Sequence, residues 1–163
     1  MRVWGVTGWK NTGKTTLTER LVAEFVGQGL RISTIKHAHH TTEVDHPGRD
    51  SFRHREAGAA QVIVASPVRW ALMTELRGEA EPPLDALLAK LDPCDLVLIE
   101  GYKSAPHPKV ETHRDAAGRD LLAPGNPTVR AIASDGRPQT ALPLFDLDDV
   151  GGIAAFIRRE VGL

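Results

Sequence analysis

Residues 8–15 read Gly-Trp-Lys-Asn-Thr-Gly-Lys-Thr and match the pattern G-x-x-x-x-G-K-[ST] at every defined position. Glycines let a backbone curl so that successive N–H groups point inward at an anion. Lys14 adds a positive charge for the β- and γ-phosphates of a nucleotide, and Thr15 offers a hydroxyl to Mg²⁺. A helix that follows directly aims the positive end of its dipole at the same place. The motif therefore predicts a nucleoside triphosphate site, with a plain glycine turn before a capped helix as the alternative.

An acidic residue at the end of a hydrophobic strand holds part of the Mg²⁺ in such sites. Glu100 follows the run Leu-Val-Leu-Ile at 96–99 and precedes Gly101, so it fits that placement. Glutamate is one methylene longer than the commoner aspartate, so we expect its carboxylate to reach the metal through a water or to polarise an attacking water. A solvated acid at a strand end is the alternative. We assign Lys14 and Glu100 to the chemistry of the phosphates, and Thr15 and Glu100 to the metal.

Five of the seven histidines lie between residues 37 and 54. This segment follows the second predicted strand, so in a parallel sheet it emerges on the side of the phosphate loop. Three interpretations are open: a site for a phosphorylated ligand beside the nucleotide, a solvated polar loop, or a transition-metal site. The metal site would use His37, His39 and His40, although no cysteine lies nearby and the spacing fits no standard closed zinc site.

Residues 109–113, Lys-Val-Glu-Thr-His, alternate with period two. Lys109, Glu111 and His113 therefore share one face of a predicted strand. We expect that face either to border a ligand or to face water.

The motifs need elements to position them, and the apolar pattern alternates between strands and helices. Strands are predicted at 3–7, 30–36, 61–65, 68–73, 95–100, 109–114 and 129–133, and helices at 14–26, 52–57, 83–91 and 152–161. This order implies an α/β fold with a mainly parallel sheet, right-handed crossovers and helices on both faces. The strands at 61–65 and 68–73, joined at Ser66-Pro67, predict an antiparallel hairpin within a mixed sheet.

Composition limits the class of protein. The 163 residues, 41% apolar and 25% charged, fit one globular domain over residues 1–163. The formal charge of −1 leaves no basic field for nucleic acid or an anionic membrane, so a bound anion must be held locally. The single cysteine, Cys94, excludes an internal disulfide and favours the cytoplasm. No apolar stretch approaches the ~18 residues that cross a bilayer.

Several motifs together resemble one family. They are Gly-Trp-Lys-Asn-Thr-Gly-Lys-Thr-Thr-Leu at 8–17, Ile-Lys-His-Ala-His-His at 35–40, Asp-His-Pro-Gly-Arg-Asp-Ser-Phe-Arg-His at 45–54, Ala-Gly-Ala at 57–59, Leu-Ile-Glu-Gly-Tyr-Lys at 98–103 and Pro-Lys-Val-Glu at 108–111. In this order they resemble the MobB family, the accessory proteins of molybdopterin-guanine dinucleotide biosynthesis. The phosphate loop is generic, whereas the histidine-rich segment and the Glu-Gly-Tyr-Lys strand end are far more specific.

The resemblance implies a P-loop NTPase fold of three layers and a GTP-binding protein that hydrolyses GTP slowly with Mg²⁺. It also implies a homodimer that assists MobA, the nucleotidyltransferase that attaches GMP to molybdopterin, and leaves direct binding of molybdopterin open. By the motif, the residues around the phosphates are Gly8, Asn11, Thr12, Gly13, Lys14, Thr15 and Thr16. Dimeric ATPases with a deviant loop carry a lysine directly after the first glycine. Here Trp9 takes that position, and Lys10 follows as a candidate contact of the nucleotide.

The usual guanine-reading motif Asn-Lys-x-Asp is absent. Asp135, just past a predicted strand, is our candidate for that role, because a carboxylate accepts hydrogen bonds from N1–H and N2–H₂ of guanine, which adenine does not match. Two other functions stay open. One is a metallochaperone GTPase that delivers Ni²⁺ or Zn²⁺ through His37, His39 and His40. The other is a small-molecule kinase with a mobile lid that carries Arg49, Arg53 and Arg55.

Overall fold

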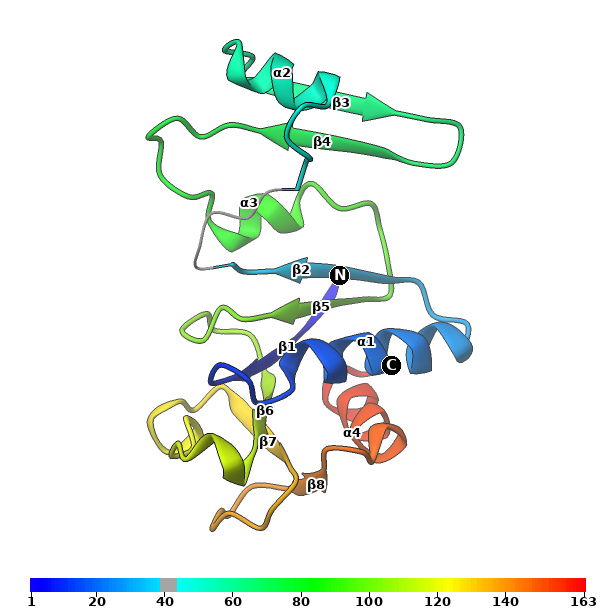
Figure 1. Cartoon of the computed structure of the whole chain (residues 1–163). Coiled ribbons are helices and arrows are strands. Elements are labelled where there is room, and N and C mark those ends of the chain that lie inside the picture. Colours follow the sequence, from blue (N-terminus) through cyan, green and yellow to red (C-terminus); the bar gives the residue numbers. More distant parts are fainter. Residues whose placement is uncertain (39–43) are drawn as a thin grey trace. The chain divides into compact units, whose positions relative to one another are not determined.

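The computed structural model describes residues 1–38 and 44–163, and Figure 1 shows its helices and strands. The chain divides into two compact units. The first unit joins Met1–Ala38 with Leu91–Leu163, and the second unit is His39–Lys90. Each is described by itself below. The expected single domain over residues 1–163 stays a prediction.

The first unit is built on a six-stranded sheet in the order β2-β5-β1-β6-β7-β8. Its strands are β1 (Arg2–Gly8), β2 (Ile32–Lys36), β5 (Leu96–Glu100), β6 (Lys109–His113), β7 (Val129–Ser134) and β8 (Leu144–Asp146). Every pair of neighbours is parallel. The carboxyl ends of the strands therefore meet at one edge, which is where open α/β sheets bind ligands.

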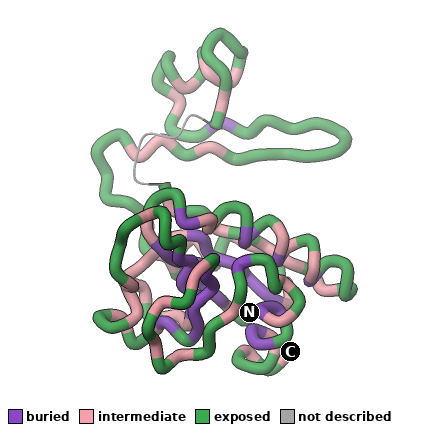
Figure 2. Tube along the Cα trace, turned by 60° about the horizontal axis from the view of Figure 1, so that its bottom comes forward, coloured by how far each residue is buried: buried purple, intermediate pink, exposed green. Residues whose placement is uncertain are grey.

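One face of this sheet carries the apolar core. Two helices, α1 (Lys14–Gly27) and α4 (Val150–Val161), pack there against β1 and β5. Trp4 of β1 lies at the centre, with its ring edge-on to Phe156 of α4 at 6.0 Å between ring centroids. Figure 2 shows the buried chain gathered inside this unit. Burial of such side chains stabilises a fold by about 1.5–3 kcal/mol each, so the core holds β1 and α1 in place.

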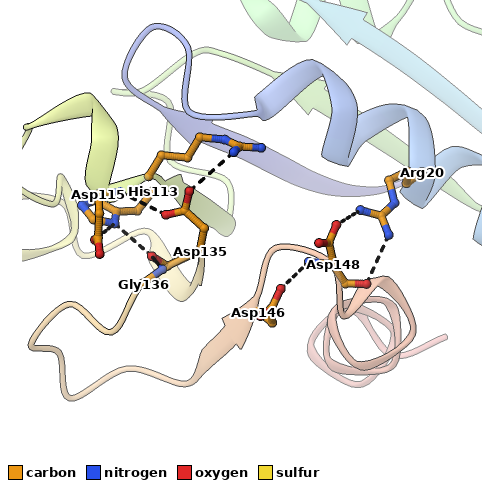
Figure 3. Close-up of polar contacts among 9 residues, drawn as sticks. Arg20, His113, Asp115, Asp135, Gly136, Asp146 and Asp148 are labelled. Atoms are coloured by element: carbon orange, nitrogen blue, oxygen red, sulfur yellow. Dashed lines mark hydrogen bonds and ion pairs between the residues drawn. The ribbon is translucent and has the colours of Figure 1, made fainter.

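The two helices are also joined at their polar ends. Arg20 of α1 contacts the carboxylate of Asp148 at 2.5 Å, in the turn between β8 and α4 (Figure 3). Asp149 caps α4 by accepting a hydrogen bond from the Gly152 N–H, and Gly162 ends the helix in the left-handed conformation. These local signals explain why α4 begins and ends where it does.

The opposite face of the sheet carries polar side chains that residues 101–108 and 114–128, here called the covering segment, contact. Lys109 is fully buried, and its ammonium donates to the carbonyls of Ala105 and His107 and to the hydroxyl of Thr128, at 2.6–2.8 Å. Burial lowers the pKa of Lys109 to about 8. Glu111, also fully buried, accepts from the N–H groups of residues 122 and 123.

The expectation that Lys109 and Glu111 border a ligand or face water is therefore wrong. Both side chains hold the covering segment on the sheet, because a buried charge needs partners from the chain itself. That segment contains the short 3-10 helices η1 (Asp115–Ala117) and η2 (Ala123–Gly125). In the first unit, the α-helices α1 and α4 therefore cover one face of the sheet, and the 3-10 helices η1 and η2 lie on the other.

The second unit holds α2 (Asp50–Glu56), the hairpin of β3 (Gln61–Ala65) and β4 (Trp70–Thr74), and α3 (Leu84–Leu88). Arg55 of α2 is paired with Glu75 at 2.7 Å and Asp45 at 3.8 Å, which joins the helix to the chain on both sides. Within the described residues the hairpin forms its own two-stranded sheet, so the expectation of a mixed sheet is wrong. One hairpin face is apolar: Ile63, Trp70 and Leu72 are 65%, 70% and 41% exposed.

Most predicted elements are confirmed, usually within one to three residues at each end. The mainly parallel sheet and the antiparallel hairpin are confirmed as well. Strand β8 and both 3-10 helices lie where no regular element was expected. Among the described residues, no helix is long and apolar enough to span a membrane.

Candidate phosphate-binding site

The loop between β1 and α1 has the curled backbone that the motif predicts. Gly8, Asn11 and Gly13 have positive φ angles of 144°, 65° and 95°. A Cβ atom on Gly8 would lie 2.5 Å from the carbonyl oxygen of Thr112, so no other residue fits there without a shift of β6. Asparagine is among the few non-glycine residues that adopt a positive φ readily. The residue types at these positions are therefore those that the loop geometry requires.

Thr12 anchors the loop from below. Its buried hydroxyl lies 2.8 Å from the hydroxyl of Thr112 on β6 and donates to the Trp9 carbonyl at 2.8 Å. Thr112 in turn donates to the carbonyl of Thr7 at 3.1 Å. Thr12 and Gly8 thus support the cradle, while other loop residues face its opening.

The ammonium group of Lys14 folds back over the loop and donates to the Trp9 carbonyl at 2.6 Å. Burial lowers the pKa of Lys14, the carboxylate of Glu100 opposes that shift, and the cations Lys103 and Lys36 reinforce it. When burial and neighbouring cations disfavour the charged form of an ammonium group, an added anion stabilises that form. The electrostatics of the loop therefore favour a polyanionic ligand.

Thr15 and Glu100 lie together, as predicted for the metal. The Thr15 hydroxyl donates to Oε1 of Glu100 at 2.8 Å, and Lys36 Nζ lies 3.5 Å from each of these two oxygens. Neighbouring ligands of an octahedral Mg²⁺ stand about 2.9 Å apart, because each lies at about 2.0–2.1 Å from the metal. The spacing of this oxygen pair fits two adjacent positions around Mg²⁺, with Lys36 moved aside.

An open cleft of about 600 Å³ lies over the loop. Eight residues line it: Lys10, Asn11, Gly13, Lys14, Thr15, Thr16, Glu100 and Arg114. The structure thus brings together the predicted loop residues and Glu100, with Gly8 and Thr12 behind them. Arg114 was missed, because a single arginine after a strand carries no motif. Its one signal was its place directly after 109–113, at the edge where the strands end.

Asp135, the candidate guanine reader, follows β7 beside the end of β6. One carboxylate oxygen accepts from the Asp115 N–H at 3.0 Å, and the other lies 3.5 Å from Nη1 of Arg114. Figure 3 shows Asp135 with His113, Asp115 and Gly136 at these two strand ends. Asp135 does not line the phosphate cleft itself, and its role in guanine recognition stays a prediction.

The histidine-rich segment lies only partly within the described residues. His37 follows β2 and stacks on Tyr102, with ring centroids 4.3 Å apart. His39 and His40 lie outside the described residues. Across residues 1–38 and 44–163, no three His, Cys, Asp or Glu side chains are grouped closely enough to hold a metal ion. Arg49, Arg53 and Arg55 belong to the second unit, whose placement relative to the phosphate cleft is not defined.

Comparison with known proteins identifies a family for this chain. The profile of the family described as "Molybdopterin guanine dinucleotide synthesis protein B" matches residues 3–135. The chain is 44% identical over 154 residues to the molybdopterin-guanine dinucleotide biosynthesis adapter protein of Escherichia coli (strain K12), across 91% of this chain and 87% of that protein. The Haemophilus influenzae adapter protein is 41% identical, across 95% of this chain and 86% of that relative.

Solved structures of MobB proteins share the fold of this chain. The crystal structure of Bacillus subtilis MobB superposes with a TM-score of 0.76 at 27% identity, over 99% of this chain and 98% of that one. A MobB homologue from Bacillus stearothermophilus superposes with a TM-score of 0.71 at 30% identity, over 99% of both chains. The predicted fold class is confirmed, and the chain belongs to the MobB family.

Proposed function

We propose that this chain is a GTP-binding adapter protein in the biosynthesis of molybdopterin guanine dinucleotide. The observation that carries the proposal is the pairing of Thr15 with Glu100 at 2.8 Å beneath a complete phosphate loop. The names of its relatives support the pathway, since they are adapter proteins of that biosynthesis. A cytoplasmic location, expected from the single cysteine, stays a prediction.

In this proposal the loop amides and Lys14 bind the triphosphate. Lys14 exchanges the Trp9 carbonyl for phosphate oxygens, which relieves the cost of an ammonium placed near Lys36 and Lys103. Thr15 and Glu100 hold Mg²⁺, which neutralises charge that develops on the phosphates. Lys36 then moves from its position 3.5 Å from both oxygens. Lys10 lines the same cleft and adds a further cation.

GTP hydrolysis by this site is slow in the proposal. Glu100 is the only carboxylate that lines the phosphate cleft within the described chain, and its Oε1 is engaged by Thr15. A carboxylate committed to the metal is a poor base for an attacking water. The chain therefore acts mainly through binding, as an accessory to the nucleotidyltransferase MobA.

We also propose that the chain works as a homodimer. The apolar hairpin face of Ile63, Trp70 and Leu72 supports this, since monomers rarely leave large apolar side chains grouped in water. A second copy would cover this face with the same residues, as a two-fold interface requires.

Calorimetric titration with GTP and ATP, each with and without Mg²⁺, tests the function. We expect saturable GTP binding that Lys14→Ala abolishes and that Lys90→Ala, an exposed lysine of the second unit, leaves unchanged. In Glu100→Gln, GTP affinity no longer rises when Mg²⁺ is added, because the metal loses an anionic ligand. Unchanged GTP affinity in Lys14→Ala would refute the site.

A further inference from the structure

Arg114 occupies a position over the phosphate loop that the proposed function does not yet use. It comes directly after β6, and it lines the phosphate cleft together with Lys14 and Thr15. Its guanidinium atoms lie 3.5–4.0 Å from the point where a Cβ on Gly13 would stand, at the start of α1. The guanidinium group therefore lies against the loop at the N-terminus of α1.

A fixed carboxylate holds this arginine. Asp135 Oδ2 lies 3.5 Å from Arg114 Nη1, while Oδ1 accepts from the Asp115 N–H at 3.0 Å. Arg114 and Asp135 have 44% and 36% of their side chains exposed, and Arg114 lines the phosphate cleft. Guanidinium carries five N–H donors, and Asp135 is the one acceptor within 3.5 Å among the described residues. Most of these donors are left for a ligand.

The turn that carries Asp135 is itself held in place. The hydroxyl of Ser134 lies 3.0 Å from Nδ1 of His113 and accepts from the Gly136 N–H at 3.0 Å. The Asp115 carboxylate packs against Gly136 of the same turn. Hydrogen bonds at the ends of β6 and β7 therefore hold the turn that carries Asp135 (Figure 3).

We propose that Arg114 is a further phosphate-binding residue and that Asp135 positions its guanidinium over the loop. The inference rests on the proposed function. An arginine suits the role because its planar donors bind two phosphate oxygens at once. When the nucleotide binds, Arg114 turns part of its donors from Asp135 to the phosphates, and the carboxylate keeps the remaining donors oriented.

A neighbouring cleft supports the assignment to an anion. It has about 460 Å³, shares Lys10, Asn11 and Arg114 with the phosphate cleft, and adds Arg119. No acidic side chain lines it within the described residues. Arg114 thus stands between two cationic clefts, where a phosphate group is the favoured occupant.

The proposal competes with guanine recognition by Asp135. A guanine reader needs both carboxylate oxygens for N1–H and N2–H₂, yet one of them already accepts from the Asp115 backbone. The two roles differ in one measurable respect. A positioning role affects GTP and ATP equally, because both carry the same phosphates, whereas base recognition affects GTP alone.

The test measures GTP and ATP affinity in Arg114→Gln, Arg114→Lys, Asp135→Asn and the Arg114→Gln/Asp135→Asn double variant. We expect Arg114→Gln to weaken both nucleotides by the same factor, roughly tenfold to hundredfold, with Arg114→Lys in between. Asp135→Asn weakens both by a smaller common factor and has no further effect in the double variant, because its role acts through Arg114. Arg130→Gln is the matched control, since it removes an arginine–glutamate pair of 3.4 Å at the other end of β7.

Two results would overturn this proposal alone. Unchanged nucleotide affinity in a folded Arg114→Gln variant would show that Arg114 does not bind phosphate. A loss of affinity for GTP but not for ATP in Asp135→Asn would assign the carboxylate to guanine recognition instead. Thermal unfolding of each variant establishes that it is folded, and Arg114→Lys keeps the charge should Arg114→Gln fail to fold. The proposed function fails if the unaltered chain binds no nucleotide, or if Lys14→Ala binds nucleotide as tightly as the unaltered chain. In either case this inference fails with it.

Discussion

His107, next to the buried Lys109 on the polar face of the sheet, makes the stability of the fold depend on pH. Its ring packs over Gly5, where a Cβ would lie 2.7 Å from Nε2. Among the described residues, neither ring nitrogen has a hydrogen-bond partner. Burial lowers the pKa of His107 to about 4, and the nearby Lys109 ammonium adds to the shift. The folded protein therefore keeps this imidazole neutral.

The pH dependence of stability follows from that shift. Between pH 6.5 and 4 the unfolded chain takes up a proton on His107 that the folded chain does not. The free energy of unfolding therefore falls as the pH falls through this range, by up to about 3 kcal/mol from this group. Urea unfolding at pH 7 and pH 4.5 measures the loss.

The variant His107→Gln should lose less stability between these two pH values than the unaltered chain, because it has no group to titrate there. His54→Gln, which removes an exposed histidine of α2, is the control and should keep the full loss. An equal loss in the unaltered chain and in His107→Gln would show that His107 is protonated in the folded state.

Residues with a defined motif could be predicted from the sequence, and residues whose role depends on the fold could not. Lys14, Thr15 and Glu100 were predicted to lie together because loop chemistry demands those types at those positions, and the structure brings them to one cleft. Lys109 was misread, because alternation shows which side chains share a face and not what covers that face. The covering segment, residues 101–108 and 114–128, has no regular periodicity, so its contacts appear only in three dimensions.

At the scale of elements, the phosphate loop depends on β6 as much as on β1. Gly8 pairs with Thr112 in the parallel ladder, and the hydroxyls of Thr12 and Thr112 meet beneath the loop. The loop shape is therefore set by a strand that lies far from it in the sequence.

Gly8→Ala tests this dependence. The variant would place Cβ 2.5 Å from the Thr112 carbonyl oxygen, on a backbone with φ of 144°. We expect a loss of about 2 kcal/mol or more in the free energy of unfolding, measured by urea denaturation. Gly151→Ala is the control, because no atom lies within 4 Å of its Cβ position and alanine favours the helix. Equal stability of the two variants would contradict a tight approach of β6 to the loop.

Helices and strands of five residues or more were predicted, whereas the three-residue elements were missed. The β3 strand at Gln61–Ala65 was predicted with its observed bounds. Strand β8 has only three residues, Leu144–Asp146, too few for an alternating pattern to stand out. The hairpin was found, but the separation of its sheet from the parallel one depends on tertiary packing that local sequence does not report.

For the whole molecule, the exposed hairpin face bears on the proposed homodimer. We expect the unaltered chain to sediment as a dimer and the double variant Ile63→Glu/Trp70→Glu to sediment as a monomer, because like charges buried on both copies would oppose the interface. Val26→Lys, which changes an exposed apolar residue of α1, should leave the dimer intact. A monomeric unaltered chain at micromolar concentration would contradict the proposal.

The order of strands has a consequence for synthesis on the ribosome. β1 emerges first, yet its neighbours in the sheet, β5 and β6, are Leu96–Glu100 and Lys109–His113. A growing chain of which only residues 1–100 have left the ribosome lacks Thr112, so the phosphate loop lacks the contact that supports Thr12. Under the proposed function, nucleotide capture therefore waits until β6 has been synthesised, and a bound nucleotide cannot template the folding of the segments before it.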